Sequence, residues 1–186
     1  MTNKLLVERG CEKIEMDILF TEEQIKTRIK ELGKQISCDY KGKELLVVGV
    51  LKGSFVFMAD LVRAIDTPLS INFIGASSYV GTKSSGYIRI NHDLTTNIKD
   101  RHVLLVEDIV DTGETIDYLC EVFKLRGPAS LKICSFLTKP EVRDMRTRLD
   151  YIGFEIPKEF VVGYGLDYNE QFRELPFLTK VLKISK

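Results

Sequence analysis

Short runs of consecutive apolar residues alternate along this chain with segments whose apolar residues recur at helical spacing. Continuous apolar runs are typical of strands that are buried on both faces of a sheet. The predicted strands are residues 45–50, 69–74, 102–106, 131–137, 151–156 and 160–164. The helices predicted among them are residues 55–65 and 115–125. This order indicates an α/β fold with an open, mostly parallel sheet and helices on both faces.

A further helix is predicted before the first of these strands. Thr21-Glu22-Glu23-Gln24 matches a capping box, in which the first and fourth residues satisfy each other's backbone N–H groups. The apolar residues that follow at helical spacing are Ile25, Ile29, Leu32 and Ile36. We therefore expect one amphipathic helix that begins at Thr21.

Residues 77–97 interrupt the alternation. They are rich in Ser, Gly, Thr and Tyr, and their apolar pattern is limited to Tyr87-Ile88-Arg89-Ile90. We predict a long polar loop here. A long loop within a compact domain is usually functional or disordered, and composition leaves both alternatives open.

Length and charge narrow the class of protein. The 186 residues contain no repeat or linker, so we expect a single domain over residues 1–186. The 27 basic residues balance the 27 acidic ones, which argues against the basic face that broad nucleic-acid binding needs. No apolar stretch reaches the length of a signal peptide or the roughly 20 residues of a membrane span. We therefore expect a cytoplasmic protein that binds neither nucleic acid nor membranes.

The cysteines indicate neither a metal site nor a redox site. They lack the spacing of zinc ligands or of a redox pair, and the two histidines do not complete a cluster. The residues concerned are Cys11, Cys38, Cys120, Cys134, His92 and His102. We expect four reduced thiols.

The strongest functional signal lies between the strand at 102–106 and the helix at 115–125. Two acids, Glu107 and Asp108, follow the apolar run, and Asp111-Thr112-Gly113-Glu114-Thr115 leads into the helix. Ligands bind beyond the carboxyl ends of parallel strands, where a helix N-terminus offers N–H groups to phosphate. The acids suit sugar hydroxyls or Mg²⁺. The alternative is a capped helix with solvated acids, but the full pattern favours a metal-bound phosphorylated ribose.

The segment Val106-Glu107-Asp108-Ile109-Val110-Asp111-Thr112-Gly113-Glu114-Thr115 resembles the phosphoribosyl-pyrophosphate loop of type I phosphoribosyltransferases. From about Leu45 to the C-terminus, the chain resembles the hypoxanthine-guanine branch of that family. The resemblance implies the family's fold, with a core at about residues 40–150. It also implies a small hood, formed by the N-terminal segment and about residues 151–186.

The resemblance assigns roles within this loop. Glu107 and Asp108 would contact the ribose hydroxyls, partly through Mg²⁺. The 5′-phosphate would be bound by Asp111, Thr112, Gly113, Glu114 and Thr115. Asp111 would also act as the general base toward N7 of the purine.

Three further segments match the pyrophosphate site of the family. Lys52-Gly53 follows a predicted strand, where an ordinary turn is the plain alternative. The resemblance implies that this turn binds pyrophosphate, with a cis peptide before Lys52. It implies that Ser78 and Tyr79 approach the pyrophosphate as the loop closes over the reacting centre, and that Arg173 contacts it.

The purine site is implied by residues nearer the C-terminus. Lys139 would donate to the exocyclic O6 and so select 6-oxopurines, whereas the plain alternative is a solvated lysine. Phe160 would stack on the purine, and Val161 would contact the ring edge through its backbone. Asp167 would bind a second Mg²⁺ through water, and its backbone region would help to read the purine 2-position. Without the resemblance, residues 154–170 read as a β-hairpin followed by a turn.

The implied reaction joins hypoxanthine, and also guanine, to the ribose of phosphoribosyl pyrophosphate, giving IMP or GMP and pyrophosphate. One alternative is a non-catalytic regulator that senses phosphoribosyl pyrophosphate. A neutral chain with a single N-terminal helix does not favour that reading. A second alternative is the same fold acting on adenine, xanthine or a pyrimidine. Lys139 and Phe160 favour a 6-oxopurine, and the preference among hypoxanthine, guanine and xanthine stays open, because it depends on backbone placement near Val161 and Asp167. The family commonly forms homodimers or homotetramers, so we expect one of these assemblies.

Overall fold

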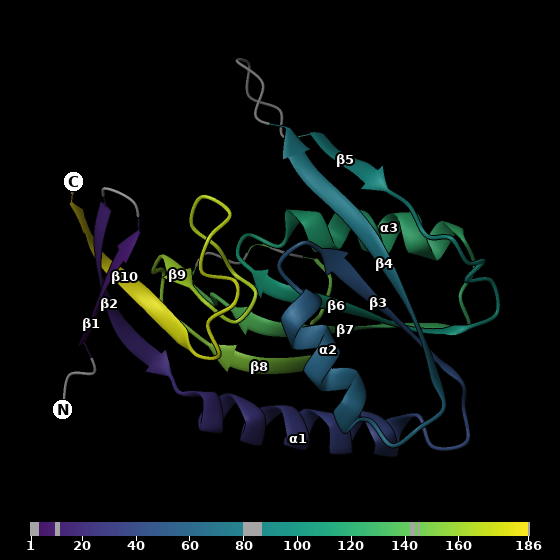
Figure 1. The fold of residues 1–186 in the computed structure, drawn as a ribbon. Coiled ribbons are helices and arrows are strands. Elements are labelled where there is room, and N and C mark those ends of the chain that lie inside the picture. Colours follow the sequence, from purple (N-terminus) through teal and green to yellow (C-terminus); the bar gives the residue numbers. More distant parts are fainter. Residues whose placement is uncertain (1–3, 10–11, 80–86, 142–143, 145, 186) are drawn as a thin grey trace.

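The computed structural model describes residues 4–9, 12–79, 87–141, 144 and 146–185. Within these ranges the chain forms two sheets and three helices (Figure 1). The elements are β1 Lys4–Arg9, β2 Glu12–Phe20, α1 Glu22–Asp39, β3 Leu45–Leu51, α2 Phe55–Ala64, β4 Leu69–Tyr79, β5 Tyr87–His92, β6 His102–Val110, α3 Glu114–Leu125, β7 Ser130–Thr138, β8 Tyr151–Glu155, β9 Val161–Val162 and β10 Leu178–Ser185.

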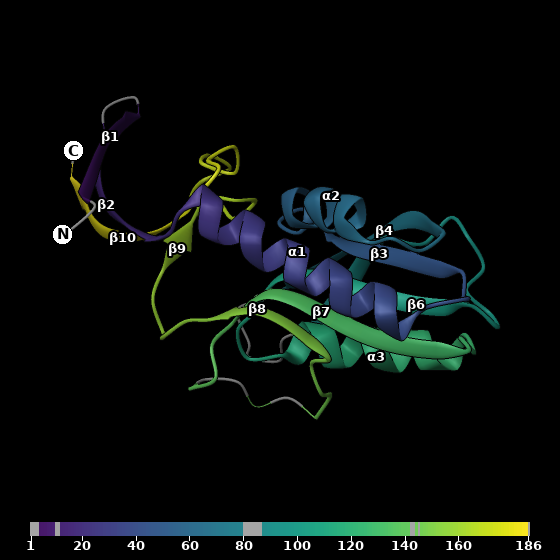
Figure 2. The ribbon, with the colours of Figure 1, turned by 90° about the horizontal axis from the view of Figure 1, so that it is seen from below.

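The larger sheet has the strand order β5-β4-β3-β6-β7-β8, and only the β4–β5 pair is antiparallel. Helices α1 and α2 cover one face, and α3 covers the other (Figure 2). The predicted mostly parallel sheet with helices on both faces is therefore confirmed.

Strand β6 shows why the parallel strands read as continuous apolar runs. Val103 and Leu105 pack into the cluster beneath α3, whereas Leu104 and Val106 pack into the cluster beneath α1 and α2. All four side chains are fully buried. Because alternate residues face opposite layers, both sets must be apolar.

The capping box at Thr21 is confirmed. The Thr21 hydroxyl accepts a hydrogen bond from the backbone N–H of Gln24, and the Gln24 side chain accepts one from the N–H of Thr21. The apolar residues predicted to line this helix are buried against the sheet: Ile25, Ile29, Leu32 and Ile36.

The smaller sheet contains both ends of the chain, in the order β1-β2-β10-β9, and all its pairs are antiparallel. Strands β1, β2 and β10 were not predicted. In β2 the signal is alternation, since Ile14 and Met16 are buried while Lys13 and Glu15 are exposed. Strand β8 lies in the larger sheet, so residues 151–155 belong with the core rather than with a hood that begins at residue 151.

One prediction and one alternative interpretation do not match the structure. Residues 77–97 are not one long loop, because β4 continues to Tyr79 and pairs with β5, the edge strand of the larger sheet. Residues 154–170 do not form a hairpin, because β8 and β9 lie in different sheets.

Two strands also end at other residues than predicted. Strand β6 continues four residues beyond the predicted end at 106, because it pairs with β7 as far as Val110. The strand expected at 160–164 is only Val161–Val162. No helix in the described part of the chain is long and apolar enough to cross a membrane.

Candidate functional site

A cavity of about 440 Å³ opens at the carboxyl ends of β3 and β6. From β3 the chain continues to β4 on one side, and it later places β6 on the other side of β3. Such a reversal leaves a crevice beyond the strand ends, which is where open α/β sheets bind ligands. The described residues that line it are Val50–Gly53, Ala76, Ser77, Glu107–Gly113, Thr115, Ile116, Asp167 and Arg173.

The loop from Asp111 to Thr115 connects β6 to α3 at one side of the cavity. Gly113 is the N-cap of α3 and has φ +96°, a left-handed conformation that glycine adopts without steric cost. The N–H groups of the first helical turn have no acceptor within the helix. This end of the cavity therefore suits a phosphate group.

Glu107 and Asp108 lie at the end of β6 within the cavity wall. Glu107 is 7% exposed, and its Oε2 atom has no hydrogen-bond partner among the described residues. Burial raises the pKa of Glu107 well above its usual range, and the charge of neighbouring Asp108 adds to the effect. One Asp108 oxygen accepts the N–H of Ile109 at 2.8 Å.

The turn after β3 packs closely against this acidic pair. A Cβ atom on Gly53 would lie 1.6 Å from an oxygen of Asp108, so only glycine fits there. The cis peptide expected before Lys52 is present between Leu51 and Lys52. The loop from Asp111 to Thr115 and the Lys52-Gly53 turn thus share one cavity.

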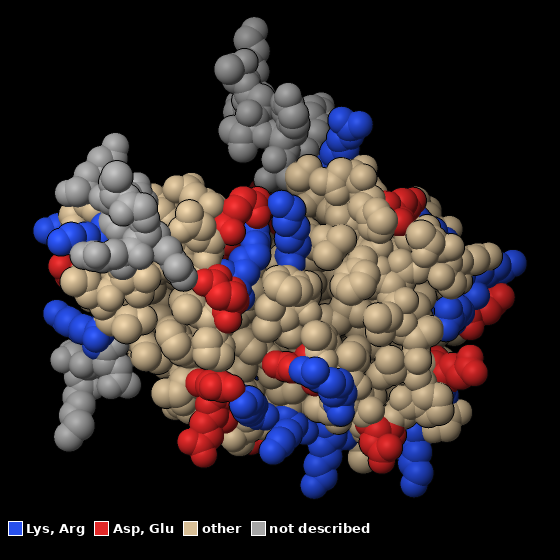
Figure 3. Space-filling model, viewed as in Figure 1, with Lys and Arg blue, Asp and Glu red and all other residues tan. Residues whose placement is uncertain are grey.

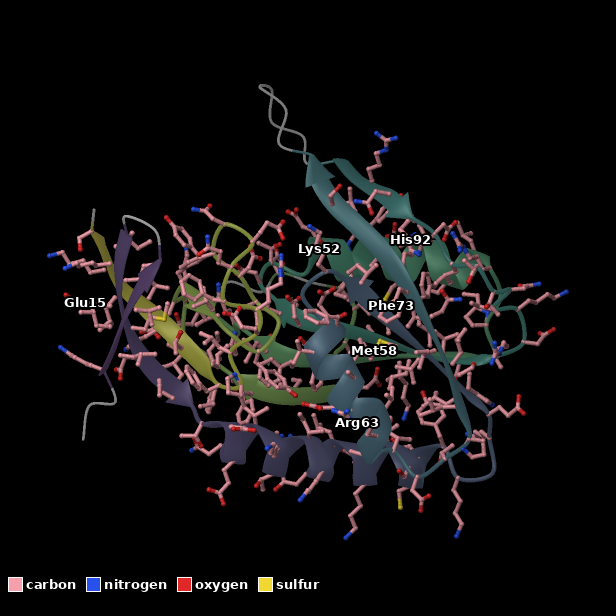
Figure 4. All side chains as sticks on the ribbon, viewed as in Figure 1. Glu15, Lys52, Met58, Arg63, Phe73 and His92 are labelled. Carbon is pink, nitrogen blue, oxygen red and sulfur yellow. The ribbon has the colours of Figure 1, made fainter. Side chains whose placement is uncertain are left out.

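Two basic side chains line the same cavity as the acidic pair. Lys52 comes from the turn after β3 and is labelled in Figure 4. Arg173 comes from the segment between β9 and β10. The Arg173 guanidinium donates to the carbonyl of Gly165 at 2.8 Å and pairs with Asp167 at 2.7 Å. Figure 3 shows acidic and basic side chains next to one another on this face, between the smaller sheet and β4.

Lys139 contacts Asp111, which lines the cavity. Its Nζ atom lies 3.1 Å from an Asp111 carboxylate oxygen, and its side chain is only 11% exposed. The backbone N–H of Lys139 donates to the carbonyl of Val110, which fixes the start of the segment after β7 to the end of β6. A buried ammonium and a carboxylate therefore stand side by side at the rim.

The remaining candidates lie outside the cavity wall or outside the described residues. Phe160 is 53% exposed, and its ring stands edge to face with Tyr168. The Val161 side chain is buried in β9, and Glu114 is exposed. Ser78 and Tyr79 have backbones in β4, but their side chains lie outside what the structure describes.

Sequence reasoning missed two residues near the site. Glu170 pairs with both Lys52 and Arg173. Asp117, in the first turn of α3, accepts the backbone N–H groups of Arg146 and Thr147. The spacing of Glu170, three residues from both Asp167 and Arg173, could have identified it, whereas the Asp117 contacts depend on a distant segment.

The acidic side chains fit a magnesium ion held largely by substrate and water. No three His, Cys, Asp or Glu side chains in the described segments form a metal cluster of their own. Mg²⁺ usually takes one or two carboxylates, completing its shell with water and phosphate oxygens. The unpaired buried oxygen of Glu107 beside Asp108 matches such a donor set.

The chain is similar to a family model and to several known proteins. The model of the phosphoribosyl transferase domain matches residues 15–169. The hypoxanthine-guanine phosphoribosyltransferase of Streptococcus pneumoniae is 51% identical over 162 residues, covering 87% of this chain and 90% of its own. The hypoxanthine phosphoribosyltransferase of Haemophilus influenzae is 47% identical over 174 residues, covering 91% and 97%.

Solved structures are similar over the same range. A crystal structure of a hypoxanthine phosphoribosyltransferase from Staphylococcus aureus has a TM-score of 0.85 and 47% identity. The match covers 89% of this chain and 90% of that chain. Both the sequence and the fold are therefore shared over nearly the whole length.

Proposed function

Because the chain belongs to the phosphoribosyltransferase family, we propose that it transfers the phosphoribosyl group of phosphoribosyl pyrophosphate to hypoxanthine and guanine in purine salvage. The products are IMP or GMP and pyrophosphate. The observation that carries this proposal is the single cavity shared by the loop after β6 and the Lys52-Gly53 turn. One ligand that spans both needs a 5′-phosphate at one end and a pyrophosphate at the other.

The ribose is held between these two ends. The loop residues Asp111, Thr112, Gly113, Glu114 and Thr115 bind the 5′-phosphate, with N–H groups at the start of α3 as donors. Glu107 and Asp108 accept hydrogen bonds from the ribose hydroxyls. The unpaired, buried Oε2 atom of Glu107 supports this role, because a hydroxyl donor would satisfy it.

Magnesium neutralises part of the negative charge on the departing pyrophosphate when it is bound. Glu107, Asp108 and Asp167 would hold it together with substrate oxygens. Lys52, Gly53 and Arg173 bind the pyrophosphate, with Ser78 and Tyr79 approaching it from β4. The arginine fork suits this anion, since it offers parallel donors to two oxygens.

Lys139 and Asp111 read one edge of the purine. Lys139 donates to O6, while Asp111 accepts the proton from N7 as N9 attacks C1 of the ribose and the bond to pyrophosphate breaks. O6 and N7 are neighbours on the same edge of a 6-oxopurine. The 3.1 Å contact between Lys139 and Asp111 supports this pairing of roles.

The other purine contacts come from the segment around β9. Phe160 stacks on the ring, and its 53% exposure leaves a face available. Val161 and the backbone near Asp167 contact the ring edge at the 2-position. Adenine presents an amino donor at position 6, so it would leave the Lys139 ammonium facing another donor.

The test is a pyrophosphate-release assay with phosphoribosyl pyrophosphate, Mg²⁺ and each purine base in turn. We expect turnover with hypoxanthine and guanine, and roughly 10⁴-fold less with adenine, because a site built around one hydrogen bond rejects the analogue that lacks it. A reaction without base measures hydrolysis. Binding of phosphoribosyl pyrophosphate without turnover on any base would contradict the enzyme and indicate a sensor.

We also propose that the protein works in the cytoplasm as a homodimer or homotetramer. Its family membership supports an assembly of identical chains. Light scattering coupled to size-exclusion chromatography measures the mass directly, and a mass of 21.2 kDa would contradict the proposal.

A further inference from the structure

Glu170 forms ion pairs with both basic residues of the proposed pyrophosphate end. Its Oε1 atom lies 3.1 Å from Lys52 Nζ, and its Oε2 atom lies 3.3 Å from the Arg173 guanidinium. The two cations come from segments about 120 residues apart in the sequence, so one carboxylate joins them. To bind Lys52 and Arg173, pyrophosphate would have to displace the Glu170 carboxylate from both side chains.

The local backbone holds Glu170 in this position. Glu170 and the preceding Asn169 have φ values of +62° and +51°, a left-handed conformation that side chains other than Asn and Asp rarely adopt. The N–H of Glu170 donates to Asp167 at 2.8 Å. Asp167 thereby fixes the turn that presents Glu170 to Lys52 and Arg173.

The described residues that line the cavity include more acidic than basic side chains, so an anion that enters it is repelled as well as attracted. Among the described residues that line it, Lys52 and Arg173 are basic, whereas four are acidic: Glu107, Asp108, Asp111 and Asp167. Glu170 adds another carboxylate beside the two cations. A free pyrophosphate anion therefore meets cations whose charge is already offset, and the carboxylate it displaces stays nearby.

We propose that Glu170 is an internal counterion that makes the site select pyrophosphate complexed with a divalent cation over free pyrophosphate. The inference rests on the proposed function, because it takes Lys52 and Arg173 as the pyrophosphate ligands. When the anion arrives with a bound cation, its reduced charge weakens the repulsion from Glu170. Free pyrophosphate carries its full negative charge and is repelled more strongly. The Glu170 carboxylate therefore disfavours binding of the free anion relative to the complex.

The test compares the binding of pyrophosphate with and without Mg²⁺ by isothermal titration calorimetry. In Glu170→Gln, which keeps the shape and removes the charge, free pyrophosphate should bind about fivefold more tightly, as expected for the loss of two competing surface ion pairs. The magnesium complex should gain less, so the preference for it should shrink. Glu15→Gln is the control, because Glu15 is an exposed glutamate of the smaller sheet, away from Lys52 (Figure 4).

Two further measurements separate this role from a structural one. High ionic strength should reduce the effect of Glu170→Gln, because salt screens exposed charges. The effect should also be smaller on a Lys52→Met background, since one of the two cations is then absent. A residue that only shaped the turn would change binding of both ligand forms in the same direction and by the same factor.

An unchanged preference for the magnesium complex in Glu170→Gln would overturn the inference, as would weaker binding of both forms. Either result would leave the proposed function intact if the wild-type protein binds pyrophosphate. A wild-type protein that binds neither form would contradict the proposed function, and the inference with it.

Discussion

Asp111 occupies a position where two proposed roles meet, since it belongs to the phosphate loop and also contacts Lys139 at 3.1 Å. The Asp111 carboxylate is a hydrogen-bond acceptor, and the largely buried Lys139 ammonium beside it is a donor. Their contact sets the distance between acceptor and donor. That relation matches the N7 and O6 atoms of a 6-oxopurine, which is more specific than either residue alone.

We expect Asp111→Asn to lower kcat by about 100-fold or more, because an amide cannot accept the N7 proton and general-base catalysis contributes at least that factor. Binding of the nucleotide product should change much less. Steady-state kinetics and calorimetry measure the two effects. A variant with near-normal kcat would remove Asp111 from the role of general base.

Gly53 tests whether the turn after β3 positions the acidic pair. An alanine Cβ would lie 1.6 Å from the Asp108 carboxylate, so the turn or the carboxylate must move. We expect Gly53→Ala to lower kcat/KM by about 100-fold, the effect of a misplacement of about 1 Å in an active site.

Gly42→Ala is the matched control for this substitution. Replacing Gly42 strains the backbone, because its φ is +75°, but an added Cβ would meet nothing within 4 Å. It should lower stability modestly and leave kcat/KM unchanged. Equal losses of activity in the two variants would mean that the effect of Gly53→Ala is not local.

At the scale of elements, α3 holds two parts of the site together. Its N-terminus carries the phosphate loop, and Asp117 in its first turn accepts the N–H groups of Arg146 and Thr147 at 2.9 and 2.8 Å. Another backbone bond joins Asp144 to the Thr112 carbonyl. The segment that follows Lys139 is thereby tied to the phosphate loop.

We expect Asp117→Ala to destabilise the protein by about 1–2 kcal/mol, because two backbone donors lose their acceptor. The KM for hypoxanthine should rise more than the KM for phosphoribosyl pyrophosphate, since the freed segment begins at Lys139. Urea unfolding and initial-rate kinetics measure both.

Glu121→Ala provides the comparison on the same helix. Glu121 contacts Arg146 through an exposed ion pair of 3.8 Å, so its removal should cost less than about 0.5 kcal/mol. If Glu121→Ala had the same effect on the KM for hypoxanthine, the role assigned to Asp117 would be wrong.

At the scale of the whole molecule, the carboxyl and amino ends of the strands in the larger sheet differ in function. The carboxyl ends of its strands form the cavity, whereas Asp39 at the end of α1 joins Lys132 of β7 and Tyr151 of β8. The hydrogen bond from Lys132, followed by that from Tyr151, lowers the pKa of Asp39. This cluster fastens α1 to two strands without taking part in the site.

Asp39 therefore contributes a pH-dependent part of the stability. Because its pKa is lower in the folded state, its contribution is present above the unfolded value of 3.8 and is lost as the pH falls through the folded value. We expect Asp39→Asn to cost about 0.5–1 kcal/mol at pH 7, a figure that allows for solvent screening. Urea unfolding across this pH range measures the difference, which should vanish at acidic pH.

Lys132→Met should remove most of the same pH-dependent difference, and the double variant should add little. Fully additive losses would contradict a shared cluster. Activity should be unaffected in all three variants, because the cluster lies at the opposite ends of β7 and β8 from Lys139.

The sequence by itself determined the layered fold, and it predicted the chemistry of the segment from Val106 to Thr115. The alternation of strands and helices could be predicted from the sequence. A strand in a sheet with helices on both faces needs apolar side chains on both sides, as Leu104 and Leu105 show. The capping box at Thr21 was equally legible, since both partners lie within four residues. Patterns of this kind can be predicted because the interacting residues are close together in the sequence.

Only the tertiary structure decided which distant residues meet. The contacts of Lys139 with Asp111, Glu170 with Lys52 and Asp117 with Thr147 join separate segments, and no local pattern encodes them. The second sheet was missed although residues of β2 alternate, because β2 pairs with β10 from the other end of the chain and alternation does not show which strand is the partner. Strand pairing and ion pairing depend on proximity in space, which the order of residues specifies only through the complete fold.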